Sequence, residues 1–294
     1  MNYSSNSDTI TRDFFDSLLL ESRYIDSDLP STKLELYGRT FDTPVMTAAL
    51  SHLGNTAENG MVIYAKSAAK ANAVHWVGMG EDKELEDICA TGAATIKIIK
   101  PHADNKEVFR KIEHAKKAGC FAVGMDIDHA FNGSGGYDNV LGLPMKPKTV
   151  EELREFVQAA EIPFIVKGVL STKDAEKCLK AGCKGIQLSH HHGIMSYAVP
   201  PLMMLPEILQ VTRGEIPVFI DCGIESGMDV YKCLALGATA VSVGRHLMPL
   251  LKEGADKTAG RIKEMTGELA ATMARTGVKD LKSFDPTVIH QRNF

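Results

Sequence analysis

The chain has 294 residues, of which 44% are hydrophobic and 24% are charged, and its formal net charge is −4. These values are typical of a globular protein in water and argue against an electrostatic affinity for nucleic acid or for an anionic membrane. No apolar run approaches the roughly 20 residues of a membrane-spanning helix, and the amino-terminal residues show no signal-peptide pattern. We therefore expect a cytoplasmic protein, and the six cysteines, which form no CxxC pair, favour a reducing compartment.

Residues 1–43 are expected to form an extension before the first strand of the main fold. Apolar residues recur at helical spacing from Ile10 to Ile25, and residues 31–38 predict a short strand followed by a turn. We expect this extension to plug the amino-terminal end of the fold.

Eight short apolar runs then alternate with helical patterns, and each of the last four carries polar residues near its carboxyl end. Their bounds are 44–49, 73–80, 95–101, 122–128, 163–168, 185–193, 217–224 and 240–246. This alternation is typical of a parallel βα barrel. We predict a single α/β domain over residues 1–294: a (β/α)8 TIM barrel at 44–250, preceded by the extension at 1–43 and followed by carboxy-terminal helices at 251–294.

The segment after the fourth run, residues 129–149, is rich in Gly, Pro and Asn and is longer than an ordinary βα loop. Active sites of such barrels lie at the carboxyl ends of the strands, where long loops often act as lids. We expect one site at this face, built from Lys167, the run His190–His192, Asp221, and Gly244 with Arg245.

Gly244 and Arg245 directly follow the eighth run, which is the usual phosphate position of these barrels. A guanidinium and backbone N–H groups suit a phosphate dianion, although a glycine turn with a solvated arginine is the alternative. Lys167 ends an apolar run, and three roles suit it there: holding negative charge, forming a Schiff base, or extending its ammonium group to water. We favour the electrostatic role.

One histidine of the run His190–His192 is a candidate general base. Adjacent residues rarely converge on one metal ion, so we predict no metal site and keep a metal-dependent barrel as the minority alternative. Asp126 and Asp128 leave the fourth strand on the same face, which lets Asp128 orient a histidine. Asp126 needs a partner, for which Lys97 is the candidate. Alternatively, both acids form structural ion pairs with Lys97 and Lys167.

Four short motifs follow one another in the second half of the chain. They are Lys167-Gly168, Ser189-His190-His191-His192-Gly193, Asp221-Cys222-Gly223-Ile224 and Gly244-Arg245. In this order they resemble the FMN-dependent 2-hydroxy acid oxidase and dehydrogenase family, to which glycolate oxidase, lactate oxidase and mandelate dehydrogenase belong. The resemblance is strong over residues 160–250 and weaker, though in register, over 23–128. It implies an FMN oxidoreductase with a small-molecule substrate, assembled as a homo-oligomer (tetramer or octamer).

The resemblance also implies a role for each residue at the strand ends. Lys167 would stabilise reduced flavin at its N1/O2 edge, His191 would be the active-site base, and Asp128 would pair with His191. Lys97 and Asp126 would stand at the pyrimidine edge. The full set of residues placed against FMN is Ala48, Ala49, Leu50, Gly78, Lys97, Asp126, Lys167, Ser189, Asp221, Cys222, Gly223, Gly244 and Arg245.

Several positions depart from the family pattern. Ile194 stands where the family has the arginine that binds the substrate carboxylate, and the segment 129–149 contains no arginine. Ile99 aligns with the substrate-binding tyrosine, and Glu225 replaces an arginine after the Asp221 motif. Without an arginine clamp a small 2-hydroxy acid would be held poorly. We therefore predict a larger, neutral or partly apolar hydroxy or carbonyl substrate, in a pocket lined by Ile99, Ile194, Met195 and Tyr197.

Other functions remain compatible with the sequence. A flavin-dependent isomerase would use the same barrel and cofactor without net oxidation. A non-catalytic barrel that binds flavin or another phosphate ligand would explain the missing arginines, but it would not need the pair His191 and Asp128.

Overall fold

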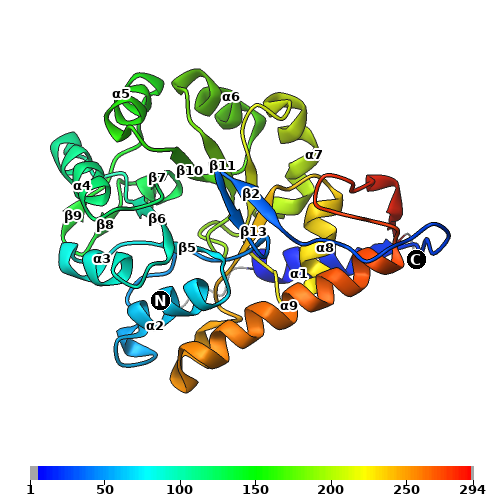
Figure 1. Cartoon of the computed structure of the whole chain (residues 1–294). Helices are drawn as coiled ribbons and strands as arrows, with labels where there is room; N and C mark the ends of the chain where they lie inside the picture. Colours follow the sequence, from blue (N-terminus) through cyan, green and yellow to red (C-terminus); the bar gives the residue numbers. More distant parts are fainter. Residues whose placement is uncertain (1–5, 293–294) are drawn as a thin grey trace.

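Eight parallel strands follow one another around a barrel in the computed structural model, which describes residues 6–292 (Figure 1). They are β4 (Val45–Thr47), β5 (Val74–Val77), β6 (Ala94–Ile99), β7 (Ala122–Asp126), β10 (Phe164–Val169), β11 (Gly185–Leu188), β12 (Val218–Ile220) and β13 (Ala240–Val243). β13 pairs with β4, and a parallel bridge between Leu50 and Val77 joins the first strand segment to β5. The predicted TIM barrel is confirmed.

Helices surround the barrel on its outside, as Figure 1 shows. They are α2 (Gly60–Lys70), α3 (Asp82–Cys89), α4 (Asn105–Lys117), α5 (Val150–Ala160), α6 (Thr172–Ala181), α7 (Pro201–Thr212) and α8 (Gly227–Ala235), and α9 (Ala255–Arg275) follows the last strand. Local sequence sets several of their starts: Thr149 with Glu152, and Ser226 with Asp229, form capping boxes that satisfy the free N–H groups of α5 and α8. None of the helices in the part of the chain that the structure describes is long and apolar enough to cross a membrane.

Strand side chains divide between two apolar layers, because successive residues of a strand point to opposite faces. Met46, Trp76, Ile96, Ile165 and Phe219 belong to the cluster that fills the barrel. The larger cluster packs the outer faces of the strands against the helices. Both faces of the strands are therefore buried. Inward-pointing side chains that lie closer to the carboxyl ends than this apolar filling can form a site there.

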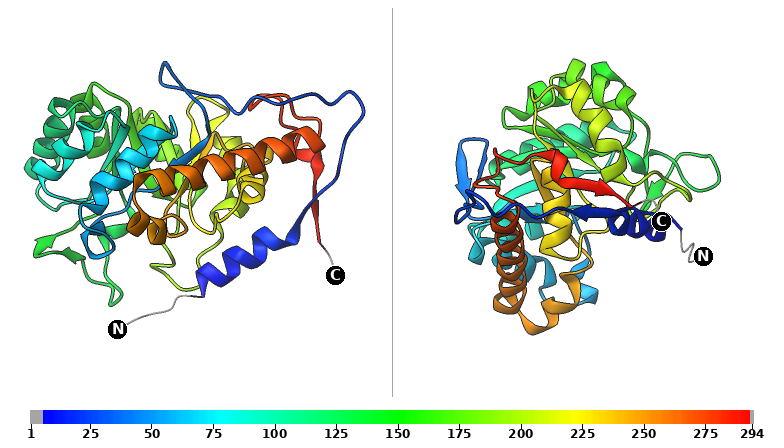
Figure 2. Two further views of the ribbon diagram at one scale, coloured as in Figure 1. Left: turned by 60° about the horizontal axis from the view of Figure 1, so that its bottom comes forward. Right: turned by 90° about the vertical axis from the view of Figure 1, so that its right-hand side faces the viewer.

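The amino-terminal extension contributes to both ends of the barrel. Leu34, Leu36 and Phe41, from the hairpin of β2 (Leu34–Leu36) and β3 (Arg39–Phe41), pack into the barrel-filling cluster, so this part of the extension forms the expected plug. The helix α1 (Ser7–Ser17) does not; it lies at the opposite, carboxyl end of the strands, where Thr11 contacts His190. The left view of Figure 2 shows α1 and the β2–β3 hairpin on opposite sides of the molecule.

Short elements complete the chain. The long segment after β7 begins with the 3-10 turn η2 (Asp128–Ala130) and carries a small hairpin of β8 (Asn139–Val140) and β9 (Leu143–Pro144). β1 (Leu18–Leu20) pairs with β14 (Ile289–Gln291), which ties the extension to the carboxy-terminal region. The remaining 3-10 turns are η1 (Leu53–Asn55), η3 (Met248–Glu253) and η4 (Pro286–Val288).

Candidate active site

Lys167 lies at the centre of the carboxyl-end site. It points into the barrel from β10 and is only 4% exposed. Its Nζ lies 3.4 Å from Asp126 Oδ1, 3.6 Å from Asp221 Oδ2 and 3.2 Å from Ser189 Oγ. Burial opposes a charged lysine, but the carboxylates of Asp126 and Asp221 outweigh it and raise the pKa of Lys167. A permanently charged ammonium suits the electrostatic role and not a Schiff base, which needs the neutral amine.

Asp126 is held by two ammonium groups. Lys100 Nζ lies 2.6 Å from its Oδ2, and Lys167 approaches its Oδ1. Burial would raise the pKa of Asp126, but the charges of Lys167 and Lys100 hold it well below the ordinary value. The prediction that Lys97 pairs with Asp126 is therefore wrong, and Lys100 takes that place.

Lys97 and Ile99 lie on the outer face of β6, because Ala94, Ile96 and Ile98 occupy the inner one. Lys97 donates to the backbone oxygen of Gly78, and burial followed by the charge of Lys111 on α4 lowers the pKa of Lys97 to about 8. Ile99 is 1% exposed within the layer between strands and helices. The predictions that Lys97 contacts flavin and that Ile99 lines the substrate pocket are wrong.

His191 is oriented by the two aspartates of the β7 end. Its Nδ1 lies 3.2 Å from Asp128 Oδ1 and 3.6 Å from Asp126 Oδ1. Burial and the Lys167 charge disfavour its protonation, but the hydrogen bonds to Asp126 and Asp128 prevail, and the pKa of His191 is raised. His191 has a left-handed backbone (φ 51°), and its N–H donates to Ser189 Oγ at 3.1 Å. The predicted base, its acidic partner and Lys167 thus form one cluster.

The other two histidines of the run point elsewhere. His190 Nε2 lies 2.8 Å from Thr11 Oγ1 on α1, and His190 Nδ1 accepts the Gly193 N–H at 3.0 Å. His192 Nδ1 lies 3.6 Å from Asp8 Oδ1, also on α1. The run therefore anchors α1 as well as supplying the base, a role that the sequence did not indicate.

Four possible metal ligands do come together at this end of the barrel: Asp126, Asp128, His129 and His191 have ligand atoms within 4.8 Å of one another. Lys100 and Lys167 already neutralise Asp126, so a divalent cation would be placed beside two ammonium groups. This charge balance argues against a metal ion, and the absence of one stays a prediction.

A cavity of about 430 Å³ adjoins the cluster. It is lined by Asp8, Ala48, His192, Asp221, Cys222, Gly223, Ile224, Glu225, Ser242, Gly244, Arg245 and His246. Six of these are residues that the resemblance places against FMN. Cys222 and Gly223 have left-handed backbones (φ 70° and 75°), and a Cβ on Gly244 would lie 3.1 Å from Ala48 Cβ, so the backbone lines the cavity closely. The cavity fits a ribityl phosphate in this respect.

Three acidic residues line this cavity; Asp221 is paired with Lys167, whereas Asp8 and Glu225 oppose an anion. Arg245 is bound by Asp8 on α1, with 2.7 Å between Nη2 and Oδ2. Glu225 lines the same cavity in place of the family's arginine. The residues therefore fit FMN, but the phosphate would have to displace Asp8 from Arg245.

The remaining predicted FMN residues also lie near the barrel mouth. Gly78 N–H donates to the backbone oxygen of Leu50 at 2.8 Å, and a Cβ on Gly78 would clash with Ser51 Oγ at 2.4 Å. Ala49 packs against the barrel-filling cluster, and Ala48 lines the cavity. Segment 48–50 and Gly78 are thus in contact, and their role in binding FMN stays a prediction.

Three site residues escaped the sequence analysis. Gln187 points inward from β11, and its Nε2 donates to Asp221 Oδ2 at 3.1 Å. His129 Nε2 lies 3.1 Å from His191 Nε2, and Lys100 binds Asp126. The available signals were a glutamine inside an apolar strand, a histidine directly after Asp128, and a lysine at the end of a strand.

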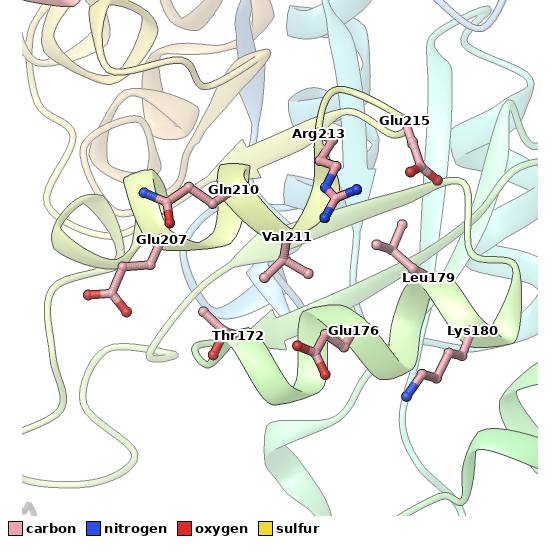
Figure 3. Close-up of a pocket in the computed structure, with 9 residues that line it drawn as sticks. All are labelled: Thr172, Glu176, Leu179, Lys180, Glu207, Gln210, Val211, Arg213 and Glu215. Atoms are coloured by element: carbon pink, nitrogen blue, oxygen red, sulfur yellow. The ribbon is translucent and has the colours of Figure 1, made fainter.

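The predicted apolar lining is not enclosed. Ile194, Met195 and Tyr197 follow His191 on the surface and are 46%, 62% and 79% exposed. A separate open cavity of about 820 Å³ lies between α6 and α7 (Figure 3) and shares no residue with the strand-end cluster. Its mixed lining, which includes Glu176, Lys180, Glu207, Arg213 and Glu215, has no histidine or cysteine. The chemistry therefore belongs to the strand ends.

Comparison with known proteins identifies this arrangement. The family profile described as FMN-dependent dehydrogenase matches residues 4–153 and 145–291. A 2-hydroxyacid oxidase of Dictyostelium discoideum is 25% identical, over 94% of this chain and 80% of the relative. An L-lactate oxidase of Lactobacillus jensenii is 28% identical, over 91% of this chain and 73% of the relative.

Solved structures agree. An arginine-to-leucine variant of mandelate oxidase with 2-hydroxy-phenylacetamide has a TM-score of 0.88 and 25% identity, over 98% of this chain and 90% of that chain. A tyrosine-to-phenylalanine variant of mandelate oxidase with a monooxide FMN adduct also has a TM-score of 0.88, with 26% identity over 98% and 92% of the two chains.

Proposed function

Because the chain belongs to the FMN-dependent dehydrogenase family, we propose that this FMN oxidoreductase oxidises a hydroxy compound whose neighbouring group is neutral, such as an amide or an ester, and not a 2-hydroxy acid. Bound FMN supplies the hydride acceptor. The chain's own residues supply the base, the fixed charges and the orientation of the substrate.

The charges at the strand ends carry this proposal. A substrate carboxylate needs a free guanidinium or ammonium group. Lys100 and Lys167 are both engaged by Asp126. Ile194 stands in place of one family arginine, and residues 129–149 contain no arginine. The carboxylate of a 2-hydroxy acid would also lie close to Asp126 and Asp128, and repulsion between like charges would disfavour its binding.

Nearby arginines have other partners. Arg12 binds Asp16 and Asp229, and Arg245 binds Asp8. The arginine-to-leucine mandelate oxidase supports the same substrate class, since that protein was solved with 2-hydroxy-phenylacetamide, a neutral amide.

Each residue of the cluster has a defined task in this reaction. His191, with Nδ1 fixed by Asp128, presents Nε2 to remove the hydroxyl proton. Asp128 and Asp126 stabilise the imidazolium that forms. Lys167, which is buried and always charged, would stabilise the negative charge that develops on the reduced cofactor.

The proposal is tested by adding hydroxy compounds anaerobically to the FMN-loaded protein and recording the visible flavin spectrum. Each 2-hydroxy acid is compared with its amide and methyl ester. We expect the neutral compounds to bleach the flavin at least about tenfold faster at equal concentration, the preference that one charge-assisted contact typically provides. Faster bleaching by the acids would overturn the proposal.

A matched pair of variants sharpens this test. Ile194→Arg restores the family's side chain and is expected to shift preference toward the acids. Met203→Arg adds the same charge at an exposed position on α7 and should leave the preference unchanged. An equal shift in both variants would mean that general charge, and not position 194, selects the substrate.

A further inference from the structure

A line of four side chains connects the centre of the site to the long segment after β7. Asp128 Oδ1 lies 3.2 Å from His191 Nδ1, and His191 Nε2 lies 3.1 Å from His129 Nε2. His129 Nδ1 lies 3.3 Å from Asp138 Oδ2. The two rings are nearly perpendicular (82°), with their centroids 4.3 Å apart. Both nitrogens of each imidazole are therefore engaged, and His191 Nδ1 also lies 3.3 Å from Lys167 Nζ and 3.6 Å from Asp126 Oδ1.

This chain has the chemistry of a proton path. Two neutral or singly charged imidazoles in Nε2–Nε2 contact need one proton between them, because one nitrogen donates and the other accepts. His129 can accept a proton at Nε2 while releasing another from Nδ1. Asp138 receives it, and its side chain is 22% exposed, so it can exchange with water. Asp128, at the inner end, is 11% exposed and holds its imidazole in place.

The mechanism leaves a need for such a path. His191 keeps a removed proton well, because its pKa is raised, and it must lose that proton before the next turnover. Burial and the Lys100 charge lower the pKa of His129, so His129 remains neutral between transfers. A neutral imidazole beside an imidazolium is an acceptor, whereas two adjacent imidazolium rings would repel each other.

We propose that His129 is the proton relay of this site: it takes from His191 the proton removed from the substrate hydroxyl and passes it through its other ring nitrogen to Asp138 and water. This inference rests on the proposed function. His129 acts through His191 and need not touch the substrate.

The steps balance. The substrate O–H bond breaks and an N–H bond forms at His191 Nε2, while bound FMN would supply the acceptor for the hydride that leaves the carbon with its electron pair. The new N–H proton then moves to His129 Nε2, the Nδ1 proton of His129 moves to Asp138, and Asp138 releases it to water. His129, now protonated at Nε2, returns to its Nδ1–H form by proton exchange with water before the next transfer. The substrate hydroxyl and His129 both contact His191 Nε2, so the hydroxyl contacts it first and His129 contacts it after the proton has been removed.

The first test needs no substrate. Histidine labelled with ¹⁵N is followed by NMR during a pH titration of the FMN-loaded protein. Five charged groups face the pair: Asp126 on β7, Lys167 on β10, Asp128 on η2, Lys100 directly after β6 and Asp138 directly before β8. These are unchanged in His129→Ala, so the variant isolates the ring contact. We expect coupled, two-step titration of His191 in the wild type and a single step in the variant. Identical titrations would overturn the relay, because the rings would then share no proton.

The second test separates relay from positioning. In His129→Ala we expect the first anaerobic flavin reduction to stay within about twofold of the wild type, while kcat falls about 100-fold, the low end for an assisted proton transfer. Added imidazole should restore kcat, and Asp138→Asn should lower it less. His114→Gln on α4, remote from the site, serves as the folding control.

A loss in the first reduction step that imidazole does not restore would overturn the relay, because His129 would then be orienting His191. If no hydroxy compound reduces the flavin of the wild type, the proposed function fails. The NMR titration still decides whether the two rings share a proton, so the two failures are distinguishable.

Discussion

The two sides of the barrel mouth hold their charges in different ways. At the ends of β7 and β10, Asp126 is bound by Lys100 and Lys167, and all three are largely buried. After β12 and β13, Arg245 is 54% exposed at its side chain and is bound by Asp8, a residue of the amino-terminal helix. The first side is a closed ion-pair cluster made by the barrel itself. The second side is open, and the partner of Arg245 comes from the amino-terminal extension.

This difference separates two functions of the site. A closed cluster fixes the positions of His191 and Lys167 before any ligand arrives, which is what proton transfer and charge stabilisation require. On the open side, an FMN phosphate bound at Arg245, as we propose, would compete with Asp8 for the guanidinium. We infer that catalysis is preorganised in this protein, whereas the hold on the FMN phosphate is weakened by its acidic neighbours.

Removing Lys167 should produce the largest effect on stability. Lys167→Met leaves Asp126 and Asp221 with less compensation in a buried site. The expected loss is about 3–5 kcal/mol of the free energy of unfolding, as for other broken buried pairs. Urea denaturation at neutral pH measures it. Lys177→Met, which removes an exposed pair with Asp174, is the control and should change little. Equal losses in the two variants would mean that the cluster is not a special source of stability.

Restoring the family's arginine tests the open side. Glu225→Arg removes a negative charge from the phosphate cavity and adds a guanidinium. We expect FMN to bind about 10–100-fold more tightly, because a charge-assisted hydrogen bond contributes about 1.5–3 kcal/mol. Fluorescence titration of the FMN-free protein gives the dissociation constant. Glu253→Arg, with the same charge change on η3, is the control. Unchanged affinity in Glu225→Arg would place the phosphate elsewhere.

The barrel and its catalytic side followed from the sequence because their signals are local. Eight apolar runs separated by helical patterns specify the fold, and Lys167, Asp128 and His191 each end a run. The face of β6 could not be read in this way. Parallel strands are buried on both faces, so ATIKII shows no alternation of apolar and polar residues. A slip of one residue then exchanges the two faces. For this reason the sequence suggests Lys97 as the partner of Asp126, whereas the structure shows Lys100 in that position.

Long-range partners were also beyond sequence reasoning. His129 and Asp138 belong to a segment whose composition predicted only a loop, and the contact of His129 with His191 joins residues 62 positions apart. Asp8 binds Arg245 across 237 positions. No periodicity links such residues, since their proximity is decided by how the extension crosses the finished barrel.

Freeing Arg245 should have a smaller effect than changing Glu225. Asp8→Asn removes the partner of Arg245 and lowers the negative charge of the cavity. The pair is exposed and is worth at most about 1 kcal/mol, so FMN affinity should rise by about three- to fivefold. Asp13→Asn on the same helix, outside the cavity, is the matched control. A fall in FMN affinity in Asp8→Asn would show that Asp8 helps to build the phosphate site instead of competing for it.

The smallest effect is expected from the pH dependence of the closed side. Burial and the charge of Lys167 lower the pKa of His191, but the hydrogen bonds to Asp126 and Asp128 outweigh them. The pKa is therefore raised on folding, so folding favours the protonated ring. Its contribution to stability is therefore present below the ordinary histidine pKa of about 6.5 and is lost as pH rises through the higher pKa of the folded state. Asp128→Asn removes part of this contribution. The difference in free energy of unfolding between wild type and variant should then be largest near pH 5–6 and shrink toward pH 8, while Asp87→Asn on α3 shows no such trend. A difference that grows with pH would mean that Asp128 stabilises the neutral ring, and His191 would then be ready to accept a proton over a wider pH range than the cluster implies.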